Sequence, residues 1–423
     1  MFVHEETVSG AGSKEIHDAW KIVRPHLIDN EMDATALQLL AAEVGVSISR
    51  AEAEEALLDM DSSKNGTVSR EEFTSWWTSS GKNNIGRLLT SVINRQSENV
   101  KYLPGIKLGD NVVACSSLEA TCKDADLLVF VTPHQFVAET CASLKKKGTI
   151  KKGAKAISLI KGMEISSDGF NLISGVIQRE LPAVDGVSVL MGANIASEIA
   201  AGNFSEATIG AYDEEHKEIF SKLFHTSAFH IATSQDVAAV EMCGTLKNIV
   251  ALAAGFVDGL GFGNNAKAAM MRVGFVEMQT LIMRTFPETN EATFMESCGV
   301  ADLITTCYGG RNRKCAEAFV KGRGAVSFED IEEELLGGQK LQGVLTSDEV
   351  QELLVSKGWE DDFPLFTTIN RIANGKIPPS AIVRYDEQGV GVGELEQRKS
   401  SRVKDRLQAY KKGGPTQGFF GEE

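Results

Sequence analysis

The sequence predicts a multidomain protein with an all-α N-terminal module, a central α/β region and an all-α C-terminal domain. Three patterns indicate this: helical stripes through residue 84, short apolar runs alternating with helical stripes over 86–235, and nearly continuous helical periodicity over 236–384. A chain of 423 residues is also too long for one ordinary domain. The tail, 385–423, is rich in charge and glycine, so we expect it to be disordered.

The composition limits the classes of partner. A content of 43% hydrophobic and 24% charged residues is typical of a soluble globular protein. The net charge of -15 disfavours nucleic acid and anionic membrane surfaces as partners. No apolar run approaches the roughly 18 residues of a membrane span, and the start carries acids where a targeting segment needs bases, so we expect a cytoplasmic protein. The seven cysteines lack CxxC spacing and are odd in number, which favours free, buried thiols over disulfides or a redox role.

The first 84 residues contain four amphipathic stripes, which predict two helix–loop–helix units. The stripes cover residues 16–23, 37–44, 49–60 and 73–77. The third begins with the capping box Ser49-Arg-Ala-Glu52.

The loop between the third and fourth helices has the ligand spacing of a calcium-binding EF-hand. Calcium takes about six to eight oxygen ligands at flexible distances. The predicted ligands are Asp61, Ser63, Asn65, the carbonyl of Thr67, Ser69 through water, and a bidentate Glu72. Gly66 permits the sharp turn, Val68 is expected to pair with the neighbouring loop, and Ser63 replaces a preferred Asp or Asn and weakens the site. The alternative interpretation is a solvated acidic turn between helices.

The first loop, around 27–33, has acids but neither the glycine nor the terminal glutamate of the pattern. We interpret it as a degenerate, nonbinding partner that completes an EF-hand pair over residues 1–84.

From residue 86 the pattern predicts a mostly parallel sheet covered by helices. The strand-like runs are 126–131, 154–160, 187–191, 207–211 and 228–232, and the helix candidates are 135–146, 168–181 and 213–224. Ligands bind beyond the carboxyl ends of strands in such sheets. Segments 132–136, 161–162 and 192–197 follow the strands and are therefore expected near a ligand.

Several long motifs make residues 86–384 resemble the NAD-dependent glycerol-3-phosphate dehydrogenases. The motifs are NVKYLPG (99–105), PHQF (133–136), SLIKG (158–162), MGANIASE (191–198), LKN (246–248), CGVADLITTCYGGRNRK (298–314) and GQKLQG (338–343). The resemblance implies a partial Rossmann-type NAD-binding domain over 86–235 and an α-helical substrate domain over 236–384. It also implies interconversion of dihydroxyacetone phosphate and sn-glycerol 3-phosphate with NADH and NAD. The large apolar helices suggest a homodimer.

An almost wholly apolar helix, 241–254, is interrupted by Lys247 and Asn248. The residues alone leave two interpretations open: a lysine that reaches solvent, or a buried ammonium with a depressed pKa that acts as an acid. The resemblance favours the second and implies that Lys247 protonates the substrate. By the same resemblance, the catalytic set is Lys247, Lys161, Asn248, Asp302 and Thr306. On its own, Asp302 would also pass for a helix cap.

The run Arg311–Lys314 follows a Gly-Gly pair and predicts a phosphate site, because arginine can bind phosphate bidentately. Arg311 and Asn312, with Lys161, are the predicted substrate ligands, and a solvated basic turn is the alternative. The resemblance further implies a cofactor site. Its residues are Phe136, Ala196, Arg311, Lys340 and Gln342.

The family opens with a strand and a Gly-x-Gly-x-x-Gly turn that holds the cofactor pyrophosphate, and this sequence has no such unit. The nearest text, residues 9–13, has no apolar strand before it and lacks the third glycine. The sheet is therefore expected to be an incomplete Rossmann-type sheet. The alternatives to an active enzyme are an incompletely predicted gene product, or a chain that has kept only the substrate half. Such a chain would be a calcium-responsive pseudoenzyme or a subunit that needs a partner. A further alternative is a pure calcium-dependent binding module.

Overall fold

A computed structural model describes most of the chain between residues 32 and 388. The described residues are 32–43, 50–65, 67–76, 82–166, 169–322, 326–336 and 341–388. The first predicted helix, most of the first loop, Gly66, Lys340 and the tail beyond Gln388 lie outside them. The first residues of the predicted disordered tail, 385–388, instead belong to a helical turn.

The described part of the N-terminal module contains the last three of the four predicted helices. They are α2 (Ala34–Glu43), α3 (Arg50–Met60) and α4 (Arg70–Trp76). Met32 and Val68 form an antiparallel bridge, in which Met32 N donates to Val68 O at 2.8 Å and Val68 N donates to Met32 O at 3.1 Å. The expected pairing of Val68 with the preceding loop is therefore present.

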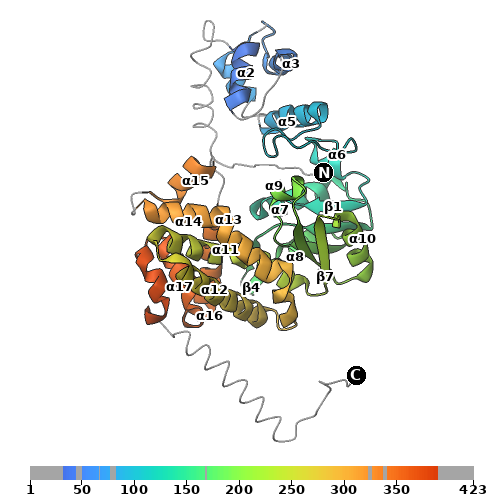
Figure 1. The fold of residues 1–423 in the computed structure, drawn as a ribbon. Helices are drawn as coiled ribbons and strands as arrows, with labels where there is room; N and C mark the ends of the chain where they lie inside the picture. The colour runs from blue at the N-terminus through green and yellow to red at the C-terminus, as the bar shows by residue number, and fades with distance from the viewer. Residues whose placement is uncertain are drawn as a thin grey trace, which may run out of the picture.

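The module shares its apolar core with the next helix, α5 (Lys82–Gln96). Val92 of α5 is fully buried in the same cluster as Leu57, Met60 and Phe73. Asn94, two residues further on, exchanges hydrogen bonds of 2.7 and 2.9 Å with the backbone of Ala114. Figure 1 shows α5 between the module and the sheet, so it connects the two.

The α/β region is built on a five-stranded sheet with the order β1-β2-β5-β6-β7. The strands are β1 (Leu127–Phe130), β2 (Ala154–Ser158), β5 (Val184–Met191), β6 (Ser205–Gly210) and β7 (Phe229–Ser234). Only the β5/β6 pair is antiparallel, so the prediction of a mostly parallel sheet is confirmed. The associated helices are α6 (Leu118–Cys122), η3 (His134–Phe136), α7 (Val137–Lys147), α8 (Ile173–Glu180), α9 (Ala196–Ala200) and α10 (Glu214–Phe224). Within the described residues, β1 is an edge strand whose one partner is β2.

The helix predicted over 168–181 begins later than expected. A hairpin of β3 (Met163–Ser166) and β4 (Gly169–Leu172) occupies its first part, and the helix starts at Ile173. The buried carboxylate of Glu241 determines this start, because it accepts hydrogen bonds from the backbone of Ile173 and from the hydroxyl of Ser174, both at 2.5 Å. This partner lies far away in sequence, so local periodicity could not locate it.

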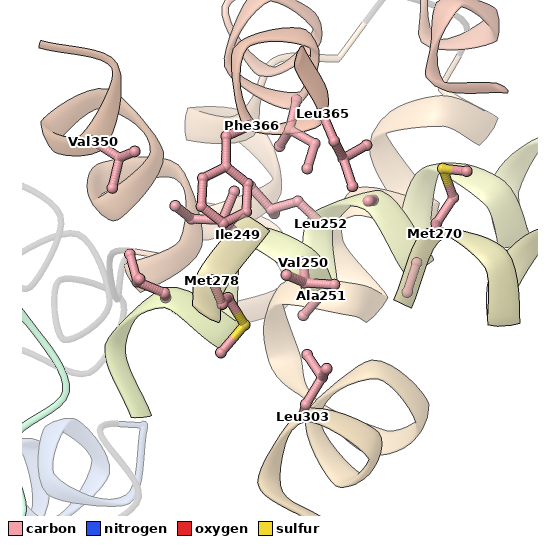
Figure 2. Close-up of a cluster of buried hydrophobic side chains, with 14 of the residues drawn as sticks. Ile249, Val250, Ala251, Leu252, Met270, Met278, Leu303, Val350, Leu365 and Phe366 are labelled. Carbon is pink, nitrogen blue, oxygen red and sulfur yellow. The ribbon is translucent and has the colours of Figure 1, made fainter. Parts of the chain in front are cut away.

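The helical domain surrounds one long helix, α11 (Val237–Leu260). Figure 2 shows Ile249 to Leu252 of α11 among side chains from the surrounding helices, including Met278, Leu303 and Phe366. These helices are α12 (Gly263–Thr285), α13 (Asp302–Gly309), α14 (Arg311–Lys321), α16 (Gln342–Lys357) and α17 (Pro364–Ala373). The domain is completed by η4 (Glu291–Met295), η5 (Ser297–Ala301), α15 (Phe328–Leu336), η6 (Glu360–Asp362) and η7 (Pro379–Gln388).

The apolar surface of α11 is used within the chain. The expectation that no segment approaches the length of a membrane span was wrong for this helix, which is long and apolar enough to cross a membrane. However, 94% of its apolar window is buried inside the protein, so the helix serves as a core helix. It therefore gives no support to the predicted dimer, which rested on large apolar helices. All seven cysteines are free and six are buried, which confirms the prediction of unpaired thiols.

Candidate active site

Lys247 lies on α11 and is 3% exposed, so it does not reach solvent. Its Nζ donates a hydrogen bond to Oδ1 of Asp302, the first residue of α13. Thr306, one turn later, donates from Oγ1 to the same oxygen at 3.4 Å. Asp302 is itself 2% exposed, and its carboxylate pairs with lysine instead of capping the helix. Three of the predicted catalytic residues are thus in direct contact.

Lys161 approaches the same carboxylate from the α/β region. It follows β2, and its Nζ lies 3.6 Å from Asp302 Oδ2, a buried oxygen that makes no hydrogen bond within the described residues. Thr245 Oγ1 donates to the carbonyl of Gly162 at 3.2 Å and holds this loop against α11. One carboxylate therefore lies between two ammonium groups.

This arrangement shifts the pKa of Lys247. Burial lowers the pKa of its ammonium, the charge of Asp302 opposes that lowering, and the charge of Lys161 reinforces it. Lys247 therefore gives up its proton more readily than an ordinary lysine, as a general acid requires.

A π-helical turn, η5, brings Asp302 to the site. Gly299 within this turn has no room for a side chain, because a Cβ there would collide with the carbonyl of Phe294. Ser297 ties the turn to the sheet: its Oγ donates to Glu206 O at 2.9 Å and accepts from Ala193 N at 3.3 Å. π-helical turns often occur at functional sites.

The two predicted asparagines contact each other. Asn312 Nδ2 donates to Asn248 Oδ1 at 3.0 Å, and Asn312 Oδ1 accepts from Gly343 N at 2.9 Å. Asn312 is 7% exposed, so its side chain is used in holding α11, α14 and α16 together. The N-terminus of α14 carries no side-chain cap, and the exposed Arg311 is its first residue.

In the N-terminal module, the carboxylate of Glu72 is folded into the predicted calcium loop. It accepts hydrogen bonds from Ser63 N at 2.8 Å and Ser69 N at 2.9 Å, and these bonds lower the pKa of Glu72 to about 2. Asp61 Oδ1 accepts from Asn65 N at 3.2 Å. No group of three or more His, Cys, Asp or Glu side chains in the described residues is placed to hold a metal ion. A cation here would rely on two carboxylates with hydroxyl, amide and carbonyl oxygens.

Two sequence profiles match most of this architecture. The profile of the NAD-dependent glycerol-3-phosphate dehydrogenase N-terminus matches residues 64–217, and that of the C-terminus matches 236–384. The chain belongs to the NAD-dependent glycerol-3-phosphate dehydrogenase family. Membership identifies it as an NAD-dependent dehydrogenase of this type.

Relatives of known name agree with this assignment. Glycerol-3-phosphate dehydrogenase [NAD(+)] of Cuphea lanceolata is 57% identical over 308 residues, which is 72% of this chain and 81% of the relative. The chloroplastic enzyme of Arabidopsis thaliana is 54% identical over 71% of this chain and 75% of its own. The cytoplasmic enzyme of Drosophila melanogaster is 50% identical over 70% of this chain and 81% of its own length. The relatives' names differ in compartment, so they do not decide the localisation of this chain.

Solved structures show the same fold. The structure from Dunaliella salina has a TM-score of 0.68 and 51% identity, and covers 71% of this chain. This chain spans about half (52%) of that longer protein. The enzyme from Saccharomyces cerevisiae has a TM-score of 0.64 and 42% identity over 70% of this chain and 85% of its own.

The residues assigned to NAD by resemblance to the dehydrogenase family lie on separate elements. Phe136 ends η3, Ala196 begins α9, Gln342 begins α16, and Lys340 lies outside the described residues. The carboxyl ends of β1, β2 and β5 meet at one edge of the sheet, where Thr132 Oγ1 is buried without a hydrogen-bond partner in the described part. Ligands of open α/β sheets bind at such an edge. No described loop has the glycine spacing that binds its pyrophosphate.

His134 and Glu349 lie beside these cofactor-site residues and were not predicted as site residues. His134 Nδ1 lies 3.1 Å from Gln342 Oε1, and His134 Nε2 lies 3.3 Å from Glu349 Oε1. His134 lies within the PHQF motif, so its position was visible in the sequence. Its contacts, 208 and 215 residues away, were not.

Proposed function

We propose that the chain interconverts dihydroxyacetone phosphate and sn-glycerol 3-phosphate with NADH and NAD, and that Lys247 is the general acid. The observation that carries this proposal is the buried Asp302 carboxylate between Lys247 and Lys161. NADH supplies the hydride when bound. Lys247 gives its proton to the ketone oxygen during reduction, and the charge of Lys161 stabilises the negative charge that develops there.

Asp302 has two roles in this mechanism. It holds the Lys247 ammonium in one orientation, and its charge limits how far burial lowers the pKa of that ammonium. Thr306 and Asn248 support the arrangement. Thr306 donates a hydrogen bond to the Asp302 carboxylate, and Asn248, the residue after Lys247, accepts one from Asn312 of α14.

The substrate phosphate is assigned to the N-terminus of α14. The uncapped backbone N–H groups of this 11-residue helix favour an anion, and the exposed Arg311 adds a charged donor. Asn312 contributes through its backbone, because its side chain is bonded to Asn248 and Gly343. The net charge of -15 makes such a local positive site necessary for a phosphorylated substrate.

Comparison of two substrates tests this assignment. Dihydroxyacetone lacks the phosphate but keeps the ketone. The proposal expects kcat/KM for dihydroxyacetone to be at least about a thousandfold lower than for dihydroxyacetone phosphate, since the lost charged contacts contribute several kcal/mol. Similar values for both would exclude a phosphate site at α14.

We also propose that residues 61–72 bind calcium as an EF-hand, with Asp61, Ser63, Asn65, Thr67, Ser69 and Glu72 as ligands. The bridge between Met32 and Val68 supports this, because paired EF-hand loops are joined through their eighth positions and Val68 is the eighth residue of the loop. Calcium then acts as a regulator or as a structural ion.

The predicted domain limits, 1–84, 86–235, 236–384 and 385–423, and the cytoplasmic homodimer remain part of this proposal. The first limit falls inside α5, which packs in the core of the N-terminal module. A calcium-binding pseudoenzyme or a truncated gene product is the alternative, because the sequence has no Gly-x-Gly-x-x-Gly unit.

A further inference from the structure

The side chain of His134 links the α/β region to the helical domain. It is 7% exposed and lies in η3, directly after β1. Both polar partners of its ring, Gln342 at 3.1 Å and Glu349 at 3.3 Å, are on α16. The ring therefore spans the boundary between the two halves of the enzyme.

The base of the His134 side chain, at Cβ, Cγ and Nδ1, packs against the loop that carries Lys161. A Cβ on Gly162 would lie 2.6 Å from both Cβ and Nδ1 of His134, so only glycine permits this approach. Thr245 Oγ1 holds the Gly162 carbonyl from α11 at 3.2 Å. The position of the imidazole therefore limits where the Lys161 backbone can lie.

The face of α16 toward the ring is polar. Gln342, Thr346 and Glu349 recur at the spacing of one helix face, and Thr346 Oγ1 and Glu349 Oε2 are buried without hydrogen-bond partners in the described part of the chain. The Glu349 side chain is 19% exposed, but a carboxylate with one buried, unpartnered oxygen is costly unless a donor meets its other oxygen. The Nε2 atom of His134 is placed to be that donor, and Nδ1 also faces an acceptor, Gln342 Oε1. Both contacts are therefore hydrogen bonds when the ring carries a proton on each nitrogen, and together they fix the rotation of the ring.

We infer that His134 is a positioning residue that orients the Gln342 amide and the Lys161 loop relative to each other. The inference rests on the proposed function, in which Lys161 contacts the substrate, and on the cofactor contact that the family resemblance implies for Gln342. With Nδ1 facing Gln342 Oε1, the amide N–H groups of Gln342 point away from the ring. Loss of the ring frees this amide to rotate, so the first property to change is affinity for the dinucleotide.

Two isosteric replacements separate the two contacts. Asparagine places its amide near the position of Nδ1, and glutamine places its amide near the position of Nε2. His134→Asn therefore keeps the contact with Gln342 and is expected to bind NADH as tightly as the wild type. His134→Gln and His134→Ala lose that contact and are expected to raise the Kd for NADH about tenfold, the effect of one lost buried hydrogen bond.

His216→Asn is the matched control. His216 lies on α10, away from α16, is 5% exposed and packs against Gly186 of β5. This variant is expected to lower the melting temperature and leave the Kd for NADH unchanged. Glu349→Gln, which keeps the side-chain volume, provides the test if the His134 variants do not fold. This variant is expected to raise the Kd for NADH about threefold.

The readouts are NADH binding by calorimetry and steady-state kcat and KM. Equal NADH affinity in the wild type, His134→Ala and His134→Gln, or unchanged affinity in Glu349→Gln, would overturn the inference. A wild type that binds NADH without turnover would overturn the proposed function alone, since the binding series still tests His134. A wild type that does not bind NADH would overturn both.

Discussion

Lys161 Nζ lies 3.6 Å from Asp302 Oδ2, although the two residues belong to different halves of the molecule. Lys161 follows β2 of the sheet, and Asp302 begins α13 of the helical domain. With Lys247 on the other carboxylate oxygen, the contact places two cations around one buried anion. The candidate active site therefore forms only when both halves are folded and packed together.

Replacement of Lys247 is expected to remove turnover without unfolding the chain. Lys247→Ala lowers kcat for dihydroxyacetone phosphate reduction by at least about a thousandfold, because a positioned general acid contributes on the order of 10²–10⁴ and the charge is lost with it. Circular dichroism checks the fold. Lys217→Met is the matched control, since Lys217 is a similarly buried lysine paired with Glu214 on α10. Wild-type turnover in Lys247→Ala would remove its assigned role.

The pH dependence of kcat tests the two neighbours of Lys247. Lys247 acts as an acid only while protonated, so reduction slows as pH rises through its lowered pKa. Asp302 raises that pKa and Lys161 lowers it. Asp302→Asn is therefore expected to move the pH at which kcat falls to a lower value, and Lys161→Met is expected to move it to a higher value. If kcat fell at the same pH in both variants, a group other than Lys247 would limit the rate.

Gly343→Ala is expected to disturb the substrate side of the site. An added Cβ would lie 2.7 Å from Asn248 O and 2.8 Å from Asn312 Oδ1, so both asparagines must move. We expect a loss of about 1–3 kcal/mol in transition-state stabilisation, a fall of roughly 5- to 150-fold in kcat/KM. Gly175→Ala, in an open position on α8, is the control and leaves kcat/KM unchanged. Equal kinetics for the two variants would contradict a role for this contact.

A buried carboxyl in the helical domain makes stability depend on pH. Glu277 accepts hydrogen bonds from Leu365 N and Phe366 N, both at 2.9 Å, and burial raises its pKa to about 8. The native state then keeps a proton that the unfolded state loses above its ordinary pKa of 4.5, so stability falls as pH rises from about 4.5 to about 8.

Glu277→Gln removes this dependence. It is expected to be less stable than the wild type at acid pH, by about 1 kcal/mol for one impaired hydrogen bond, and to lose that disadvantage toward pH 8. Thermal unfolding across this range measures it, with the exposed Glu333→Gln as control. A constant difference between Glu277→Gln and wild type at every pH would contradict the buried titration.

Calcium binding is tested at the last ligand of the loop. Glu72→Gln removes a bidentate carboxylate, so calcium affinity is expected to fall at least about tenfold. Glu71→Gln is the control, because Glu71 is exposed and occupies no ligand position. Titration by calorimetry measures both, and equal affinities would remove the loop assignment.

Periodicity predicted the elements whose patterns are local. The strands of the sheet and the long helix around Lys247 needed only apolar runs and their spacing. The start of α8 was misplaced because it depends on Glu241, which is distant in sequence.

The site residues became visible through long motifs and not through spacing. The sequence alone did not decide whether the Lys247 side chain reaches solvent or is buried. In the structure it is buried and paired with Asp302 on a facing helix. His134 was read as part of a motif without a role, because its partners come from α16.

The most direct measurement is oxidation of NADH by the purified chain with dihydroxyacetone phosphate, in calcium and then in a chelator. The account predicts turnover that forms sn-glycerol 3-phosphate and is lost in Lys247→Ala, with the chelator series testing regulation. A folded chain without turnover under either condition would contradict the account and favour the pseudoenzyme or truncated gene product.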